Sequence, residues 1–245
     1  MSSLKNIVSK ITVICLEGCH GSGKTELCKY LSKKGFNVMD EAFLDMPRYT
    51  QIPPQSLTME TIWVSNWFNR ILKINQNIQN NNSSNNNNNN SKLNNHIFIA
   101  DRSPFSAILY ARGKGHHLNP LISSQIEELR SYAQIDIKTV YLQVDDDKLW
   151  QRIEDRLKRE PERKNYGEDK RAWMEDSVRF YNQSKWDLTI NNDDLQTFQQ
   201  RTESIFKSFN LELPNNISLT NNNNNNNNNL DNNNSSKETK VQYWQ

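Results

Sequence analysis

The chain has 245 residues, with 30 lysines and arginines against 28 aspartates and glutamates, and a formal net charge of +2. It has neither a concentrated basic field nor an apolar stretch of membrane-spanning length, so we expect no nucleic-acid partner and no membrane partner. Asparagine-rich tracts at about 75–95 and 221–234 cannot bury apolar surface, which predicts one domain at 1–220, a disordered insertion at 75–95 and a disordered tail at 221–245.

Cysteine usage and the first residues bear on the compartment. Cys15, Cys19 and Cys28 are few, odd in number and close together, which favours a reducing compartment over a disulfide framework. Two lysines without an acid in residues 1–10 leave a mitochondrial presequence open. No arginine occurs there, so we expect a cytoplasmic protein.

Residues 11–25 are an apolar, β-branched run that ends in a glycine-rich turn and a lysine. Residues 18–25 match G-x-x-x-x-G-K-[ST], a loop whose glycines let successive backbone N–H groups point at a polyphosphate. In this interpretation Lys24 reaches the β- and γ-phosphates, the Thr25 hydroxyl binds Mg²⁺, and a helix over about 24–33 adds its positive end. The alternative is a glycine-rich turn that holds no ligand. The predicted cradle comprises Gly18, Cys19, His20, Gly21, Ser22, Gly23, Lys24 and Thr25.

A second short strand is predicted at 36–39, because Gly35 is a good stop for the first helix. It ends at Asp40 and Glu41. Ligand-facing residues lie at the carboxyl ends of parallel strands, so Glu41 or Asp40 is placed to face the bound phosphates. Two solvated loop acids are the alternative.

A long helix is predicted to begin at Thr58, with a broad apolar face that includes Trp63 and Trp67. An apolar stripe of this kind more often packs into the protein core than forms a ligand site. Two tryptophans one turn apart can also present a flat wall on which a nucleobase stacks.

A third strand is predicted at 96–100, and it ends in Asp101 and Arg102. An apolar strand that terminates in Asp is the Walker B pattern, in which the carboxylate meets Mg²⁺ directly or through water. Arg102 beside it would bind phosphate or orient the acceptor. Pro104 sits where helix starts favour proline and predicts a helix at 105–112.

The rest of the chain predicts further alternation of helices and strands. A helix at about 121–133 precedes a fourth strand at 139–144, and the acids 145–147 are expected to cap the next helix. The last predicted elements are helices at about 168–188 and 195–210 and a weak strand at 216–220. The pattern predicts an α/β P-loop NTPase fold, a three-layer sandwich with a parallel sheet of about five strands flanked by helices.

The helix after the fourth strand carries Arg152, Arg156 and Arg159 on one face. A solvated helix whose acids pair with these arginines is one interpretation. Its position in a phosphate-binding fold favours an arginine-rich lid that closes over a transferring phosphoryl group.

With these residues in place, the chain resembles the deoxynucleoside kinase family of P-loop phosphotransferases and, more distantly, thymidylate kinases. The similarity covers most of the chain outside the asparagine tracts. It rests on residues 16–18 and 21–25 for the opening loop and on 101–103 for the [DE]-R-S motif. Residues 141–143, followed by Arg152, Arg156 and Glu160, are similar to the family's fourth strand and lid.

The resemblance implies ATP and Mg²⁺ as cofactors and a nucleoside or nucleotide as substrate, and it leaves a homodimer open. Glu41 would be the base that takes the 5′-hydroxyl proton, Asp101 would serve Mg²⁺, and Glu160 or Glu162 would contact the sugar 3′-hydroxyl. The implied catalytic groups are Glu41, Arg102, Lys24 and Arg156. Those implied to bind ATP outside the cradle are Arg152, Arg156, Lys158 and Arg159. Those implied to contact the substrate are Glu41, Trp63, Trp67, Arg102 and Glu160.

The sequence departs from the family in the acceptor region. The tryptophan that usually follows the base is Met46 here, and the base-reading glutamine of the long helix has Asn66 or Glu60 as its nearest counterpart. In a thymidylate-type nucleoside monophosphate kinase, the nearest rival, Arg102 would bind the acceptor phosphate and no base is needed. The rival from another class is a nucleotide-dependent switch or ATPase that acts on protein partners; no N-K-x-D guanine reader is present.

Overall fold

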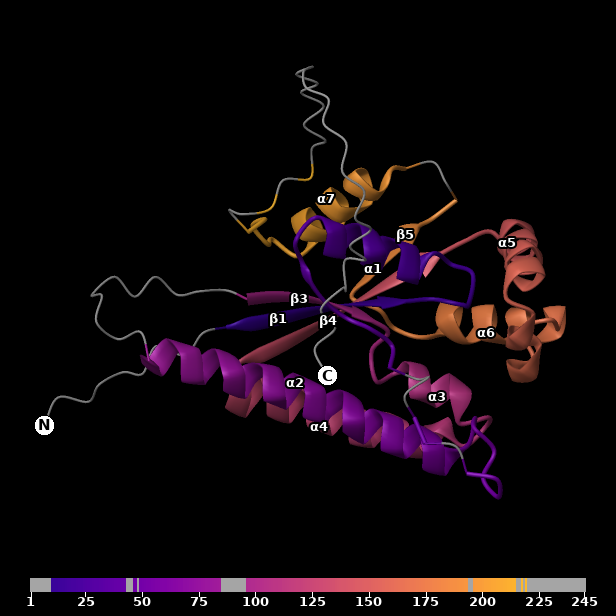
Figure 1. Ribbon diagram of the computed structural model, residues 1–245, viewed down its shortest axis with the longest axis horizontal. Helices are drawn as coiled ribbons and strands as arrows, with labels where there is room; N and C mark the ends of the chain where they lie inside the picture. The colour runs from indigo at the N-terminus through magenta and orange to yellow at the C-terminus, as the bar shows by residue number, and fades with distance from the viewer. Residues whose placement is uncertain are drawn as a thin grey trace, which may run out of the picture.

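The computed structural model describes residues 10–42, 46–47, 49–84, 96–193, 196–214, 217 and 219. At its centre is a five-stranded sheet with the strand order β2-β3-β1-β4-β5 (Figure 1). Every neighbouring pair runs parallel, which confirms the predicted parallel sheet. The strands are β1 Ile11–Glu17, β2 Asn37–Met39, β3 His96–Asp101, β4 Ile135–Gln143 and β5 Leu188–Asn191.

Helices cover both faces of the sheet and complete the three-layer sandwich. In Figure 1, α2 and α4 lie on one face, α1 and α7 lie on the other, and α5 and α6 stand beyond the carboxyl ends of the strands. No helix in the described ranges has the length and apolar character to cross a membrane. The helices are α1 Lys24–Lys33, α2 Leu57–Ser84, α3 Ser106–Tyr110, α4 Leu118–Ala133, α5 Asp146–Arg159, α6 Arg171–Gln183 and α7 Phe198–Ser208, with short 3₁₀ segments η1 Gly115–His117 and η2 Pro161–Tyr166.

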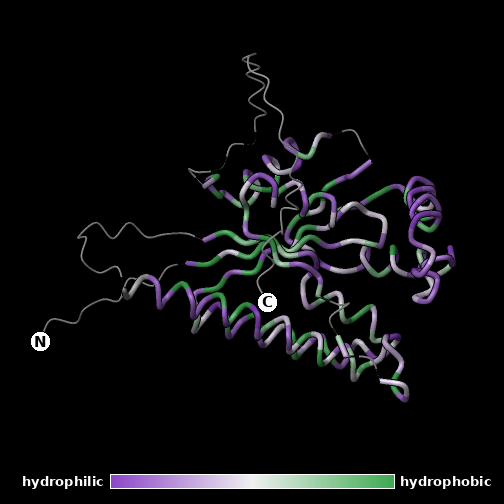
Figure 2. The backbone as a smooth tube through the Cα atoms, viewed as in Figure 1, coloured by the Kyte–Doolittle hydropathy of each residue, from purple (hydrophilic) through white to green (hydrophobic). Residues whose placement is uncertain are grey.

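The central strand β1 is buried on both faces because its side chains alternate between two apolar clusters. Val13 and Cys15 pack toward α2 and α4, whereas Ile14 and Leu16 pack toward α1 and α7. A strand covered on both faces reads as an uninterrupted apolar run, which is why this one is evident in the sequence. Figure 2 shows the same concentration of hydrophobic residues in the central strands.

The fifth strand lies elsewhere than predicted. β5 occupies Leu188–Asn191, at the end of the helix expected at 168–188, and α6 already ends at Gln183. Only Ile190 of this edge strand is buried, so its sequence carries no strand periodicity. In the segment predicted as the last strand, 216–220, the described residues are Ile217 and Leu219, and neither belongs to a strand.

The predicted disordered insertion at 75–95 begins too early, because α2 continues to Ser84. Ile74 and Ile78 still pack against the core on this side of the sheet, so the apolar stripe carries the helix into the asparagine-rich sequence. Residues 85–95 and the predicted tail at 221–245 lie outside the described residues. Elsewhere the predicted elements are present, α1 with the predicted bounds and the others with shifted ends, as in β4, which begins at Ile135 and not at 139.

Candidate active site

The phosphate-binding loop connects the carboxyl end of β1 to α1, and two of its glycines are required by geometry. Gly18 has a φ of +142°, and a Cβ there would lie 2.9 Å from the carbonyl oxygen of Leu142. Gly23 caps α1 with a φ of +93°. Other residues rarely adopt such angles, so glycine is needed to bring the backbone round toward the helix N-terminus.

Lys24 is buried and folds back over this loop. Its Nζ donates to the carbonyl oxygens of Gly18 at 2.7 Å and Cys19 at 2.9 Å. Burial, with the neighbouring charge of Arg102 second, lowers the pKa of Lys24 to about 8. The ammonium group therefore lies across the loop, in a place that favours a negatively charged partner.

Thr25 and Asp101 meet where β1 and β3 end side by side. The register pairs Leu16 with Asp101, and Thr25 Oγ1 donates to Asp101 Oδ2 at 2.7 Å. Burial raises the pKa of Asp101, an effect that the charge of Lys24 opposes. The other carboxylate oxygen of Asp101 is buried and has no partner within the described part of the chain.

This pair fits Mg²⁺, which is commonly held by one or two protein oxygens together with phosphates and water. The unpartnered Oδ1 and the hydroxyl of Thr25 supply such oxygens. The described ranges contain no group of three or more His, Cys, Asp or Glu side chains that could hold a metal ion. A cation at Thr25 and Asp101 would therefore depend on ligands from a bound nucleotide.

Arg102 follows directly after β3 and is buried beside Glu41. It has a left-handed backbone with a φ of +79°, and its Nη1 donates to the hydroxyl of Tyr181 at 2.9 Å. Its guanidinium lies 5.2 Å from the centre of the Tyr110 ring. Burial opposes the charge, yet Glu41, with Tyr110 and Tyr181 adding to it, raises the pKa of Arg102 well above its ordinary value.

The two acids after β2 have different partners. Glu41 Oε1 lies 2.7 Å from Arg102 Nε, and its side chain is 38% exposed while that of Arg102 is 6% exposed. Asp40 accepts instead from Arg70 of α2, at 2.6 Å through its carboxylate and 2.9 Å through its carbonyl. Of the two, Glu41 is the acid beside the phosphate loop.

Glu17 is a buried acid of the site that the sequence reasoning missed. It accepts from the backbone N–H of Ser103 at 2.7 Å and from the hydroxyl of Ser106 at 2.7 Å. Burial raises its pKa. It holds the turn after β3, and with it the backbone of Arg102, against the end of β1. Its signal in the sequence was an acid ending an apolar strand, the same signal that identified Asp101.

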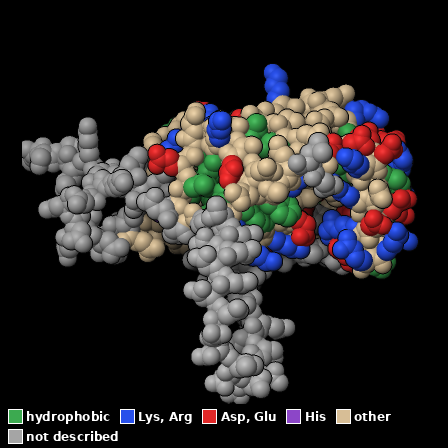
Figure 3. All heavy atoms as spheres, turned by 90° about the horizontal axis from the view of Figure 1, so that it is seen from above, with side chains coloured by type: hydrophobic (Ala, Val, Ile, Leu, Met, Phe, Trp, Pro, Cys, Tyr) green, Lys and Arg blue, Asp and Glu red, His purple; other side chains and the backbone are tan. Residues whose placement is uncertain are grey.

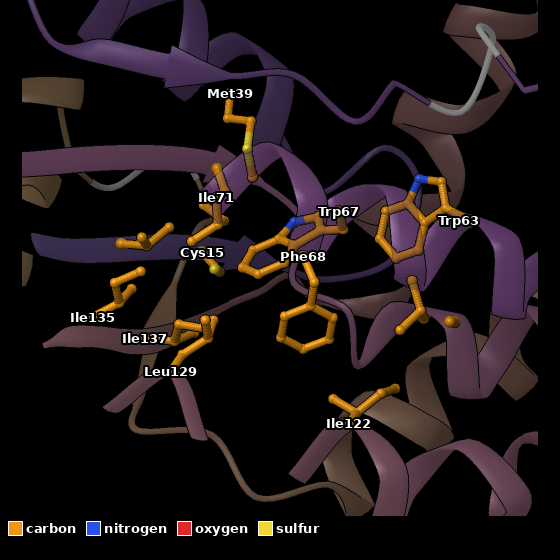
Figure 4. Packing of buried hydrophobic residues seen from close by; sticks show 14 of the residues in the cluster. Cys15, Met39, Trp63, Trp67, Phe68, Ile71, Ile122, Leu129, Ile135 and Ile137 are labelled. Atoms are coloured by element: carbon orange, nitrogen blue, oxygen red, sulfur yellow. The ribbon is translucent and has the colours of Figure 1, made fainter. Parts of the chain in front are cut away.

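Trp63 and Trp67 are both buried among the core residues that Figure 4 shows between α2 and the sheet. Trp63 Nε1 donates to the carbonyl oxygen of Glu41 at 2.9 Å, and Trp67 Nε1 donates to that of Arg102 at 3.2 Å. The two indole N–H groups therefore hold the backbones of Glu41 and Arg102 from the side of α2. Stacking of a nucleobase on them stays a prediction.

The basic side chains of α5 that were predicted to bind ATP bond to several different partners. Arg156 pairs with Glu160 at 3.2 Å. Lys158 pairs with Asp155 at 2.7 Å, and Arg159 donates to the carbonyl of Asp155 at 3.4 Å. Lys158 and Arg159 are exposed. Figure 3 shows many acidic and basic side chains together at one end of the molecule, the end that α5 and α6 form in Figure 1. The helix is capped by Asp145 as predicted, through bonds from two backbone N–H groups.

Arg163 of η2 is a further basic residue of this region that the sequence reasoning left out of the site. It pairs with Glu160 and, at 3.2 Å, with Glu168. Glu162, the alternative to Glu160, is exposed. Arg163 follows Arg159 by four residues and so continues the spacing of Arg152, Arg156 and Arg159, which is the signal that could have found it. It lies in η2, which begins at Pro161 after the end of α5, so the helix itself does not carry it.

His20 is a buried histidine of the phosphate loop whose pKa reflects the positive charges around it. It is buried in the loop, and burial is the main reason that its pKa falls to about 3. The positive charges that lower it further come from four side chains: Lys24, Arg102, Arg156 and Arg163. His20 is therefore neutral at physiological pH, and the loop that contains it lies in a field of positive charge.

The chain matches one protein family and is similar to solved structures. No curated protein sequence matches the chain. One similar solved structure is a deoxyadenosine kinase from M. mycoides with the products dCMP and a flexible dCDP bound, 18% identical over 81% of this chain and 98% of that chain, with a TM-score of 0.46. Another is the YorR protein of Bacillus subtilis in complex with phosphorylated GDP, 15% identical over 81% of this chain and 95% of that one, with a TM-score of 0.45. The sequence profile of the AAA domain family matches residues 14–173, which are more than half of the 245 residues and run from the strand before the phosphate loop to the start of α6. The chain belongs to the AAA domain family.

Proposed function

We propose that this protein transfers the γ-phosphoryl group of ATP to the 5′-hydroxyl of a nucleoside. The observation that carries the proposal is the 2.7 Å pair between Glu41 and Arg102 beside the phosphate loop. A partly exposed carboxylate held by a buried guanidinium is oriented toward a substrate that enters from solvent. Such a group can accept the proton of a hydroxyl as that hydroxyl attacks.

The donor half of the site would bind the phosphates of ATP. Backbone N–H groups of residues 18–25 and the ammonium of Lys24 would surround the β- and γ-phosphates. Thr25 and Asp101 would hold Mg²⁺, which when bound neutralises charge on the phosphate oxygens. The phosphate anions would in turn raise the pKa of Lys24 from about 8 and keep it charged.

The acceptor half would position the hydroxyl for in-line attack. Glu41 removes the proton, and Arg102, whose Nη1 also lies 3.4 Å from the Gly18 carbonyl oxygen, links the base to the loop that holds ATP. The catalytic contribution is mainly positioning and charge neutralisation, because phosphoryl transfer requires little covalent chemistry from the protein.

We assign the lid role to Arg156 together with Arg163. Their charges reach His20 in the phosphate loop, whereas Lys158 and Arg159 bond to Asp155 at the surface. Glu160 holds both lid arginines and would contact the sugar 3′-hydroxyl when the lid closes. This arrangement supports stabilisation of the charge on the transferring phosphoryl group.

A thymidylate-type nucleoside monophosphate kinase is the second candidate, and one observation favours it. The four cations that act on His20 would suit an acceptor that already carries a phosphate. Glu41 would then have no proton to remove, and Arg102 would bind the acceptor phosphate.

The test is a phosphoryl-transfer screen of the purified protein with ATP and Mg²⁺ against nucleosides, deoxynucleosides and their monophosphates. Lys24→Ala serves as the blank, because it removes the ammonium of the loop. A phosphorylated nucleoside supports the proposal and names the base. Turnover with monophosphates alone supports the second candidate. Steady phosphate release without any acceptor would contradict both and favour an ATPase or switch.

A further inference from the structure

Asn192 follows β5 and is brought against the phosphate loop by the edge of the sheet. Its side chain is almost wholly buried, with the residue 4% exposed. Its backbone N–H donates to the carbonyl oxygen of Gln143 at 2.7 Å, and its own carbonyl accepts from Arg152 of α5 at 2.9 Å. The main chain of Asn192 is therefore held from two sides, and its side chain has a fixed direction.

That side chain contacts the phosphate loop directly. Asn192 Nδ2 donates to the carbonyl oxygen of Ser22 at 2.6 Å. A Cβ on Gly23 would lie 2.9 Å from the same nitrogen, so the amide packs against the loop where the loop has no side chain. The contact spans 170 residues of sequence.

The direction of the Ser22 carbonyl determines what the loop presents to a ligand. In a trans peptide the C=O and the following N–H point in opposite directions. Holding the Ser22 oxygen on the outside of the loop therefore turns the N–H of Gly23 toward the inside. This N–H stands at the N-terminus of α1, where a phosphate gains most from backbone donors.

We propose that Asn192 is a positioning residue for the phosphate loop, which keeps the Ser22–Gly23 peptide turned so that its N–H faces the phosphates of ATP. The role rests on the proposed function, since it requires ATP at the loop. It acts on the donor half alone, because Asn192 contacts neither Glu41 nor Arg102 in any described hydrogen bond or ion pair.

The experiment compares the wild-type protein with Asn192→Leu, which keeps the branched shape without the donor, and with Asn192→Ala in case the first does not fold. Asn191→Ala is the matched control, because Asn191 is exposed and its amide donates to Asp193 and not to the loop. Calorimetry with ATP and Mg²⁺ gives the Kd, and steady-state kinetics give KM for ATP and for the acceptor. Thermal unfolding of each variant identifies any that is not folded.

Loss of one buried hydrogen bond predicts ATP binding weaker by about tenfold in the folded Asn192 variant. KM for ATP should rise in parallel, while KM for the acceptor and the Asn191→Ala values stay within about twofold of wild type. An Asn192 variant with wild-type affinity for ATP, or an equal rise in both KM values, overturns the proposal. Failure of the wild-type protein itself to bind ATP would instead overturn the proposed function on which the inference rests.

Discussion

Two glutamates near Arg102 differ in burial and in their bonding partners. Glu41 is ion-paired with Arg102 and partly exposed. Glu60 lies on α2 one turn before Trp63; it is 2% exposed, and its Oε1 has no hydrogen-bond partner among the described residues. Burial, with the negative charge of Glu41 second, raises the pKa of Glu60 to about 8. At neutral pH Glu60 is therefore mostly protonated.

The pKa of Glu60 predicts that stability falls as pH rises. The folded protein keeps this proton up to about pH 8, whereas the unfolded chain releases it near 4.5. Stability is therefore greatest below 4.5 for this group and declines between 4.5 and 8, by at most about 1.4 kcal/mol per pH unit. Glu60→Gln mimics the protonated form, so its Tm should exceed that of wild type by a margin that grows from pH 5 to pH 8.

Calorimetric unfolding at intervals across that range measures the margin. Glu154→Gln, an exposed change on α5, is the control and should give a constant difference. A margin that does not depend on pH would show that Glu60 is ionised in the folded protein.

The proposed base predicts a selective loss in Glu41→Gln. The amide cannot accept the 5′-hydroxyl proton, so kcat for a nucleoside should fall by about a hundredfold or more, with KM for ATP little changed. Asp40→Asn is the matched control, because Asp40 pairs with Arg70 and not with Arg102. Steady-state kinetics of both variants measure kcat for the nucleoside and KM for ATP. Near-normal turnover of Glu41→Gln would favour the monophosphate acceptor.

At the residue scale, the sequence identified those groups whose role follows from local pattern. Lys24 and Asp101 sit in short motifs that have a mechanism. Asn192 gains its place at the loop only through a contact with a distant part of the chain, the bond from its side chain to Ser22. No spacing along the sequence encodes such contacts.

At the scale of elements, α5 and η2 form a segment held together by charge. Glu160 joins Arg156 to Arg163, and Arg163 extends to Glu168. No residue of η2 is buried, so little apolar packing opposes its movement. In the proposed lid role, η2 and the end of α5 would exchange these ion pairs for phosphate oxygens at small cost in stability.

This arrangement predicts that Arg163 matters and Arg159 does not. Arg163→Met removes a charge that acts at the phosphate loop, so kcat/KM for phosphoryl transfer should fall by at least about tenfold. Arg159→Met removes an exposed cation bonded to the Asp155 carbonyl and should leave the value within about twofold. The measurement is steady-state transfer at saturating ATP, and equal effects of the two changes would remove Arg163 from the lid.

The elements that the sequence predicted well are those with a strong burial pattern. α1 has the predicted bounds, and β1 and β3 are buried along nearly their whole length. β5 escaped because it is an edge strand that begins beside a side-chain contact: Asp187 accepts from the backbone N–H of Thr139 at 2.7 Å. A strand positioned by one carboxylate and one buried isoleucine leaves no periodic signal.

At the scale of the whole molecule, the fold is assembled around the sheet, and α2 ends at Ser84, inside the asparagine-rich sequence. Replacing residues 85–90 with glycine and serine at equal length should leave Tm and turnover unchanged, because the last core contacts of α2 come from Ile74 and Ile78. Ile71→Ala, a change within the core, should cost about 2–5 kcal/mol. Thermal unfolding and the transfer assay measure both, and a large loss from the glycine–serine exchange would assign the tract a role in the fold.

The bonds from Glu17 to Ser103 and Ser106 have a consequence for the timing of catalysis. These bonds fix the turn that carries Arg102 to the strand that precedes the phosphate loop. The donor and acceptor halves of the proposed site would therefore be aligned when the chain folds, and would not need to be aligned again in each catalytic cycle. We expect backbone amides of β1 and β3 to resist exchange with deuterium nearly until global unfolding, while those of η2 exchange early. The slow step of turnover would then be the opening of the segment formed by α5 and η2 to release product, because the catalytic groups would already be in position.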